Sequence, residues 1–523
     1  MSTFLSAPGH ESGSPPETLR APGLTGHEAA WRRWLRPSLF DVIVVVLPLW
    51  FFVLSGDVAS SLLSDGDTGW HIRTGDWMLQ HKQFVREDLF SFSKTGQPWF
   101  AWEWLTDVLY SVIHTAAGLK GIVLLTMALA SLYVALLFRT MVRQGANIFI
   151  AFPLVMLGFG AASVHLLARP HIWTMVLLAL AMWMIEADLE KPGRRIWLLL
   201  PLTAVWTNLH GGWLALVAIL GLVAVAKAGE SWLGRAEWKT VWRYAGLAGG
   251  CLAASLLNPY GWHLHVHTFE FLTEGWAKEL ISEYKSPMFR TENMAMFEVV
   301  LLLSVVAVSQ MLRRRALVGP VLLLFWAHES LLSARHIPLF LTVALPLLAG
   351  ELARLWQAWT GSAARKSMAG IVRGIAADAQ PAISRASVWV LVPFLAAPLA
   401  PLHWPADLSA ESFPIAMVAK HRELLAHNRV FASDQWADYL IYRGAAGQKT
   451  FLDGRSDFFG EKLARDYCNL LNAPYDWRQL VKKYGFTAFL VDRRSPLASV
   501  LGEAAEWRLA DEDGKVLLFL PRN

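Results

Sequence analysis

The chain contains 523 residues, of which 54% are hydrophobic and only 17% are charged. Soluble globular domains carry about 25% charged residues, so this composition excludes a disordered chain, a fibre and most soluble enzymes. The net charge of +5 comes from Lys and Arg in short loops between apolar blocks, a pattern of membrane topology that gives little reason to expect nucleic-acid binding. The two cysteines, Cys251 and Cys468, form neither a metal-binding spacing nor an evident disulfide framework.

Residues 1–38 are rich in Gly, Pro, Ser and charge, which predicts a disordered segment. No short apolar core follows Met1, so we expect no cleavable signal peptide. The first apolar block begins at Phe40 and is preceded by Arg32, Arg33 and Arg36. These charges predict a signal anchor whose N-terminus stays in the cytoplasm.

The apolar blocks predict a polytopic α-helical membrane protein, because about 20 apolar residues cross a bilayer as a helix. The segment 103–117 is short and carries Glu103, Asp107 and His114, so it is predicted to lie at the interface or to form a partial twelfth span. About eleven spans are predicted, near 40–56, 119–140, 147–166, 171–189, 195–209, 212–229, 243–257, 293–312, 316–333, 337–354 and 387–404. The membrane module then covers 39–404, with a first outside loop over 57–118.

The loop charges predict which ends of the helices face the cytoplasm. With the N-terminus inside, alternation places nearly every dense basic cluster on the inner side, as the positive-inside rule requires. An odd number of spans places the tail, 405–523, outside. The basic turns are 139–143, 191–195, 227–243, 313–315 and 354–385.

The turns predicted to lie outside are short and unusually polar. Ionisable groups at membrane depth are costly, so they usually face a cavity or the bundle interior and mark function. Five such turns on one side predict a single site open to the outside. They read S-D-G-D-T-G-W-H-I-R-T-G (64–75), A-R-P-H (168–171), N-L-H-G-G (208–212), N-P-Y-G (258–261) and S-A-R-H (333–336).

The acidic pair Asp65 and Asp67 precedes an amphipathic helix predicted over 70–80. Asp67 is a candidate general base, since a carboxylate takes the proton of an attacking hydroxyl. Two carboxylates at this spacing also bind a hard divalent cation such as Mg or Mn through oxygen. A third interpretation is that Asp67 only caps the helix.

Arginine and histidine side chains recur in the other outer turns. The forked guanidinium groups of Arg169 and Arg335 match phosphate oxygens, although both could instead snorkel or pair with Glu329 or Asp107. The histidines could equally be hydrogen-bonded bundle residues. His263, His265 and His267 are predicted to spread around a helix, which disfavours a zinc site. The substrate-binding candidates in these turns are His71, Arg169, His171, Asn208, His210, Arg335 and His336.

The tail 405–523 alternates short β-rich runs with helical stretches, which predicts a soluble α/β domain of two or three layers. Its most polar and aromatic part contains Trp436 and Asp438. These two residues are candidates for an acceptor-binding surface folded over the membrane site, or for a structural turn with salt bridges. The predicted strands are 429–432, 449–452, 488–491 and 516–520, and the predicted helices are 436–442, 462–471 and 477–484.

The first-loop stretch D-G-D-T-G-W-H-I-R-T-G, together with F-S-F-S-K-T-G-Q-P-W, resembles a bacterial branch of the GT-C superfamily of integral-membrane glycosyltransferases. This resemblance implies a catalytic base at Asp67, a second acid at Asp65 and a sugar donor on a polyprenyl phosphate or diphosphate. It also implies a multi-pass protein of the bacterial inner membrane. The stretch 435–440 is distantly similar to the W-W-D-Y-G motif of oligosaccharyltransferase catalytic subunits, but it lacks the Trp pair and the Gly.

The favoured hypothesis is an inverting glycosyltransferase that moves a sugar from a lipid-linked donor to a glycan, lipid or protein acceptor at the outer face. A lipid or glycolipid transporter is the alternative from another class, and a scaffold of an envelope-polysaccharide complex with an inactive GT-C fold is a third. A transporter would place its polar residues near the midplane between internal repeats. Here they cluster at one face, and no internal repeat is evident.

Overall fold

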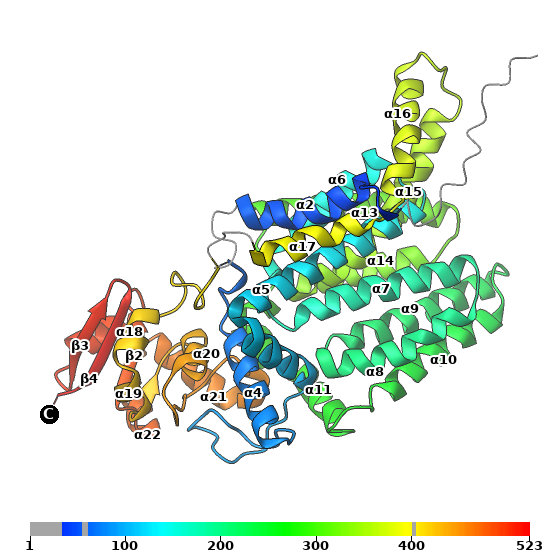
Figure 1. The fold of residues 1–523 in the computed structure, drawn as a ribbon. Coiled ribbons are helices and arrows are strands. Elements are labelled where there is room, and N and C mark those ends of the chain that lie inside the picture. The colour runs from blue at the N-terminus through cyan, green and yellow to red at the C-terminus, as the bar shows by residue number, and fades with distance from the viewer. Residues whose placement is uncertain (1–33, 55–60, 400–403, 523) are drawn as a thin grey trace, which may run out of the picture.

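The computed structural model describes residues 34–54, 61–399 and 404–522. Most of the predicted disordered segment 1–38 therefore lies outside the described residues, as do residues 57–60 of the predicted first outer loop. Up to residue 399 the described chain is almost entirely helical, and its helices pack into one bundle (Figure 1).

Five helices are long and apolar enough to cross a membrane: α5, α7, α9, α13 and α15 with the short η4 turn before it. Helices α6 and α14 are apolar but shorter, and α16 with the segment Val388–Leu399 forms a pair bent by 68°. The chain is thus a multi-pass membrane protein, and eleven spans stay a prediction. The bundle comprises α2 (Leu39–Leu54), α5 (Trp104–Arg143), α6 (Ile148–Ala162), η1 (Ser163–His165), α7 (His171–Glu190), η2 (Arg194–Leu198), α8 (Leu199–Leu209), α9 (Trp213–Trp232), α10 (Trp238–Ala254), α13 (Glu292–Arg313), α14 (Val318–Leu332), η4 (Ala334–His336), α15 (Ile337–Thr360), α16 (Met368–Ile383), η5 (Val388–Leu391), α17 (Val392–Ala396) and η6 (Ala397–Leu399).

Helix α5 joins the predicted interface segment 103–117 to the predicted span that follows it. The two parts meet at a kink at Gly118, whose φ of 63° and ψ of −159° lie in a region that is essentially restricted to glycine. Three short elements cover the outer end of the bundle beside α5, namely α11 (His263–Thr273), α12 (Trp276–Leu280) and η3 (Ser282–Tyr284).

The predicted inner turns contact one another at one end of the bundle. Arg143 pairs with Glu190 at 2.6 Å, and Arg243 pairs with Asp188 at 2.7 Å. Arg235 donates to the carbonyl of Arg314. These contacts gather four of the predicted basic turns at the same end, whereas the predicted outer turns meet at the other, as the site below shows.

The C-terminal domain has a four-stranded sheet in the order β1-β2-β4-β3, in which only β1 and β2 run parallel. Phe489 and Val491 face a core with α21, α22 and α23, whereas Ala488 and Leu490 face α18 and α20 on the other side. This alternation makes three layers. The elements are α18 (Ile415–Lys420), α19 (Arg422–Ala426), β1 (Val430–Phe431), α20 (Asp434–Arg443), α21 (Ser456–Leu471), α22 (Trp477–Tyr484), β2 (Ala488–Asp492), α23 (Pro496–Glu503), β3 (Trp507–Asp513) and β4 (Val516–Pro521).

The predicted strand over 449–452 is wrong, because Thr450 makes only an isolated parallel bridge to Ser91 in the first outer loop. That bridge is part of a larger contact between the loop and the C-terminal domain. Helix α4 (Asp67–His81) packs against α20, and Arg73 donates from Nε to the carbonyl of Tyr442 at 2.9 Å (Figure 1). The domain therefore lies against the end of the bundle where the predicted outer turns meet.

Candidate active site

Asp67 is the first residue of α4 and is 6% exposed. Its Oδ1 accepts a hydrogen bond from Trp70 Nε1 at 3.1 Å, and the preceding residue, Gly66, gives the helix no side-chain cap. The helix-capping interpretation of Asp67 thus finds no cap hydrogen bond. Asp65 accepts instead from the backbone N–H of Asp67 at 2.9 Å.

Arg169 brings the acidic pair together from the turn between α6 and α7. Its Nη1 lies 3.0 Å from Asp65 Oδ2, and its Nη2 lies 2.7 Å from Asp67 Oδ2. Nη1 also lies 2.6 Å from Glu283 Oε1 in η3. One guanidinium therefore holds three carboxylates from two other segments of the chain.

Glu283 connects Arg169 to Arg335 in η4. Arg335 Nη1 lies 3.2 Å from Glu283 Oε2, and the guanidinium stands 5.2 Å from the centre of the Tyr284 ring. The Arg335 side chain is 35% exposed, so the rest of its fork faces outward. Neither arginine pairs with Glu329 or Asp107 in the described contacts, since those acids lie against His336 and His71.

Glu103 occupies the space between two of the predicted histidines. Its carboxylate oxygens lie 3.5 Å from His71 Nε2 and 3.5 Å from His210 Nε2. His71 Nδ1 is 2.5 Å from Asp107, and His210 Nδ1 accepts from the N–H of Gly212 at 3.0 Å. The second contact fixes the tautomer of His210, whose Nε2–H then points at Glu103.

Burial perturbs the ionisation of these acids. It raises the pKa of Asp67 from 3.8 to about 7, against the opposing charge of Arg169 and with a small contribution from Asp65. Burial also raises the pKa of Glu103 to about 8, against the opposing charge of Arg335. Although burial alone would raise it, Arg169 and Arg335 hold the pKa of Glu283 at about 2. Burial thus raises the pKa values of Asp67 and Glu103 towards neutrality, whereas Glu283 stays ionised.

Asp438 approaches Asp67 from α20 rather than facing solvent. Its Oδ1 accepts from the N–H of Gly454 at 2.9 Å, and its buried Oδ2 has no hydrogen-bond partner among the described residues. A methyl group at Gly454 would overlap both Asp67 Oδ1 and Asp438 Oδ2, so the two carboxyls meet across this glycine. Burial first, and then the charge of Asp67, raise the pKa of Asp438 well above its usual range.

The remaining predicted site residues have mainly structural partners. Asn208 accepts from Trp104 Nε1 at 2.5 Å, and His171 Nε2 contacts the carbonyl of His165. His336 lies 3.4 Å from Glu329. Trp436 is 6% exposed and donates to the carbonyl of Ser412, so its ring offers little surface to an acceptor.

The residues of the acidic pair do not fit a divalent cation in this arrangement. Both carboxylates already contact Arg169, and their other oxygens accept from Trp70 and from the backbone of Asp67. Among the described residues, no group of three or more His, Cys, Asp or Glu side chains is placed to hold a metal ion. Of the three histidines of α11, His263 and His267 lie one turn apart and stack on Phe100 and Trp102. His265 instead lies 2.9 Å from the Ser255 hydroxyl, so it diverges from the other two.

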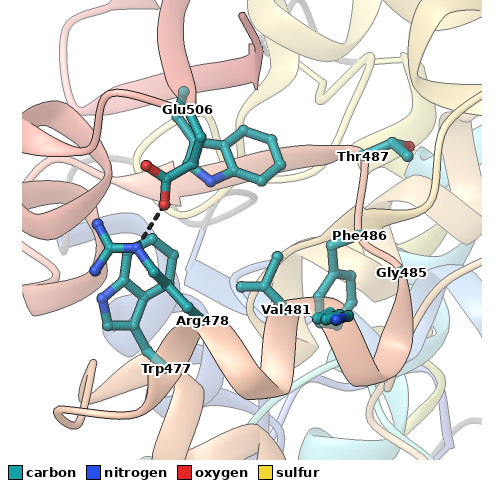
Figure 2. A pocket seen from close by; sticks show the side chains of 9 residues that line it. Trp477, Arg478, Val481, Gly485, Phe486, Thr487 and Glu506 are labelled. Carbon is teal, nitrogen blue, oxygen red and sulfur yellow. Dashed lines mark hydrogen bonds and ion pairs between the residues drawn. The ribbon is translucent and has the colours of Figure 1, made fainter.

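A separate pocket of about 410 Å³ lies in the C-terminal domain between α22 and β3 (Figure 2). Arg478 Nε lies 2.6 Å from Glu506 there, and the Trp477 and Trp507 rings are buried in the domain core. No residue of the candidate site lines this pocket.

The sequence alone assigns no site role to Glu103 or Glu283. Glu103 is only a charge in the predicted interface segment, Glu283 lies in a stretch without a motif, and Asp457 belongs to the polar stretch 451–457 of the tail. The signal for Glu283 in the sequence is its place in a short run of polar and charged residues, with Tyr284 and Lys285, ahead of a predicted span.

No protein-family model matches the sequence, and no curated protein is significantly similar to it. Among solved structures, the oligosaccharyltransferase of Archaeoglobus fulgidus in the apo form aligns with a TM-score of 0.55 at 11% identity, over 87% of this chain and 69% of that one. AglB from the same organism, in complex with an inhibitory peptide and a dolichol-phosphate, gives a TM-score of 0.52 at 12% identity with the same coverage. ArnT from Cupriavidus metallidurans bound to undecaprenyl phosphate is similar over 91% of this chain and 97% of that one, at 13% identity and a TM-score of 0.45.

At these identities the likeness concerns the fold. It extends through the bundle and into the C-terminal domain, since it covers 87% of the chain. The chain therefore shares the fold of these oligosaccharyltransferase structures.

Proposed function

We propose that this chain is a glycosyltransferase that moves a sugar from a polyprenyl-phosphate-linked donor to an acceptor hydroxyl outside the membrane, with inversion at the anomeric carbon. The fold supports the general reaction class, and the structure of AglB with a dolichol-phosphate supports a lipid-linked donor. A transporter would place its polar residues near the midplane, whereas Asp65, Asp67, Arg169 and Glu283 meet at one end of the bundle.

The observation that carries the proposal is the environment of Asp67. A general base works best when its pKa lies near the working pH, and burial brings the pKa of Asp67 to about 7. Its Oδ2 is fixed by Arg169 and its Oδ1 by Trp70, so the carboxylate is held in one orientation. Asp67 would take the proton of the acceptor hydroxyl as that oxygen attacks the sugar.

The two arginines have different roles in this proposal. Arg335 binds the donor phosphate, because only one of its nitrogens pairs with Glu283 and its side chain is partly exposed. Arg169 has both terminal nitrogens committed to carboxylates, so it orients Asp65 and Asp67 and limits the pKa of Asp67. Glu103 and His210 line the same space and would contact the sugar or the acceptor.

The topology proposed from the loop charges is eleven spans in the bacterial inner membrane, with the N-terminus in the cytoplasm. The grouping of basic turns at one end of the bundle and of the acidic site at the other supports it. The C-terminal domain would then lie outside and cover the site through α20.

The substitution Asp67→Asn tests the function directly. Asn keeps an oxygen for Trp70 but cannot accept a proton, so sugar transfer from polyprenyl-linked donors in vesicles should fall about 10²–10⁴-fold. Asp65→Asn is the matched control, since it removes a neighbouring charge while leaving the base, and it should cost much less. A stable Asp67→Asn protein with near-normal transfer would contradict the assignment of Asp67 as the base and move suspicion to Asp65. Absence of transfer by the unmodified chain would favour an inactive scaffold.

A further inference from the structure

A second cavity, of about 960 Å³, opens at the end of the bundle opposite the candidate active site. It lies where the last turn of α5, the end of α7, the η2 turn and the end of α16 meet. In Figure 1, α16 lies at the end of the bundle away from α4 and α20. None of the residues assigned to the active site lines this cavity.

The cavity is strongly cationic. Its lining includes one carboxylate, Asp188, which is already paired with Arg243 and accepts from Tyr244 at 3.0 Å. Its cationic side chains come from two segments of the chain and are Arg139, Arg143, Lys191, Arg194 and Arg195.

Most of these cations have no counter-charge in the part of the chain that the structure describes. Arg143 pairs with Glu190 at 2.6 Å. The others make no ion pair within the ranges that the structure describes, and all of them are exposed. Four guanidinium or ammonium groups around one hollow therefore offer an unneutralised anion site.

The other walls of the cavity are apolar. Val142, Trp183, Met184 and Ile196 line it beside the cations. Directly after Ile196, Trp197 is 43% exposed and Leu198 is 59% exposed, although both are large and apolar. Exposed tryptophans are typical of membrane–water interfaces, so the cavity lies at the level of lipid headgroups.

We propose that this cavity binds the phosphate headgroup of an anionic phospholipid, with Arg194, Arg195 and Lys191 on the phosphate and the acyl chains along Trp183 and Met184. A soluble anion would contact the cationic side chains but not the apolar ones, whereas a phospholipid would contact both. Basic pockets between helices on the cytoplasmic side of membrane proteins bind cardiolipin and similar headgroups by this chemistry.

The test measures the thermal stability of the detergent-purified full chain as cardiolipin or phosphatidylglycerol is added. Either lipid should raise the melting temperature, and Arg194→Gln with Arg195→Gln should raise the half-saturating lipid concentration roughly 30-fold, equivalent to about 1 kcal/mol per cation. The control double variant is Arg313→Gln with Arg315→Gln, which removes two exposed charges from another basic turn that does not line the cavity. It should bind the lipid as the unmodified chain does.

Three outcomes would overturn the proposal. Equal weakening by the two double variants would indicate general attraction to a basic surface. Equal stabilisation by inorganic phosphate at the same concentration would indicate a site for a soluble anion. A shift with undecaprenyl phosphate but not with either phospholipid would assign the cavity to the sugar carrier.

Discussion

At the scale of single residues, the Asp67–Arg169 contact sets the chemistry of the site. Burial of the Asp67 carboxyl favours its protonated form, whereas the Arg169 guanidinium 2.7 Å away favours its ionised form. The result is a group that exchanges its proton near pH 7, where a base must work.

The pH dependence of turnover should report this group. Below about pH 7, kcat/KM should fall tenfold per pH unit because Asp67 becomes protonated. Asp65→Asn should move this limb to lower pH, because the charge of Asp65 raises the pKa of Asp67. A limb that is unchanged in the Asp65 variant, or absent in the unmodified chain, would contradict the assignment.

Protonation of Asp67 should also affect stability: turnover should rise with pH, whereas the stability of the folded chain should fall. Since the folded-state pKa lies above 3.8, the folded chain binds this proton more tightly than the unfolded chain, so stability falls as pH rises from about 4 to about 7. Asp67→Asn should flatten part of that decline in melting temperature measured in detergent. An unchanged slope would show that Asp67 keeps an ordinary pKa.

Arg335→Lys should weaken donor binding while leaving the protein folded. Lysine keeps the charge but loses the planar fork, and one lost charge-assisted hydrogen bond is worth about 1.5–3 kcal/mol. The KM for the lipid-linked donor should therefore rise about tenfold or more, with a smaller change in kcat. Arg478→Lys, in the remote pocket of the C-terminal domain, is the control and should leave KM unchanged. Unchanged KM in both variants would remove Arg335 from the site.

The sequence could single out Asp65, Asp67 and Arg169 because each interrupts or flanks an apolar block, where charge is conspicuous. It could not give Glu283 the same weight, because charges in polar loops are ordinary. Nor could it show that Asp438 lies against Asp67, since that contact depends on how α20 docks on α4.

At the scale of secondary-structure elements, the contact between α4 and α20 positions Asp67, the proposed base. Gly69 allows α4 to approach closely, because a methyl group there would lie 2.6 Å from Tyr442 Cβ. Arg455 fixes the loops behind this contact: it is buried, pairs with Asp88 at 2.9 Å and Asp453 at 2.7 Å, and stands 4.4 Å from the Trp99 ring.

Gly69→Ala should therefore separate the two helices. Overpacking of this kind costs typically 1–3 kcal/mol, and the displaced Asp67 should lower transfer at least tenfold. Gly374→Ala is the matched control, because that glycine lies in α16 with nothing within 4 Å of an added methyl. It should leave transfer unchanged and stabilise the protein by up to about 1 kcal/mol. Equal activity of the two variants would show that the α4–α20 contact does not position the base.

Periodicity and hydropathy predicted most helices of the bundle, three helices of the tail and three of the four β-strands. They did not predict α16, α18, α19, α23 or the strand β3. That strand reads W-R-L-A-D-E-D and lies at the edge of the sheet beside β4. An edge strand tolerates charged residues, so the sequence lacks the apolar pattern that would predict a strand. The strand predicted over 449–452 failed for the opposite reason. Its apolar residues Phe451 and Leu452 are buried against the domain core and pair with no sheet strand.

At the scale of the whole molecule, the acidic and basic ends of the bundle imply opposite sides of a membrane. Thiol labelling in spheroplasts tests this arrangement, in a background with Cys251→Ala and Cys468→Ala. Tyr475→Cys, at a fully exposed position of the C-terminal domain, should react with a membrane-impermeant reagent in intact cells. Arg315→Cys should react only after lysis, and the reverse pattern would contradict the topology.

Helix α5 connects these two sides, with Asp107 near its outer end and Arg139 and Arg143 at its inner end. Its one break is at Gly118, where no other residue would adopt the backbone angles without strain. The kink separates the part of α5 that carries Asp107 from the part that carries Arg139 and Arg143. Since no residue of the candidate active site lines the cavity beside those arginines, a lipid bound there should change the stability of the protein rather than its turnover.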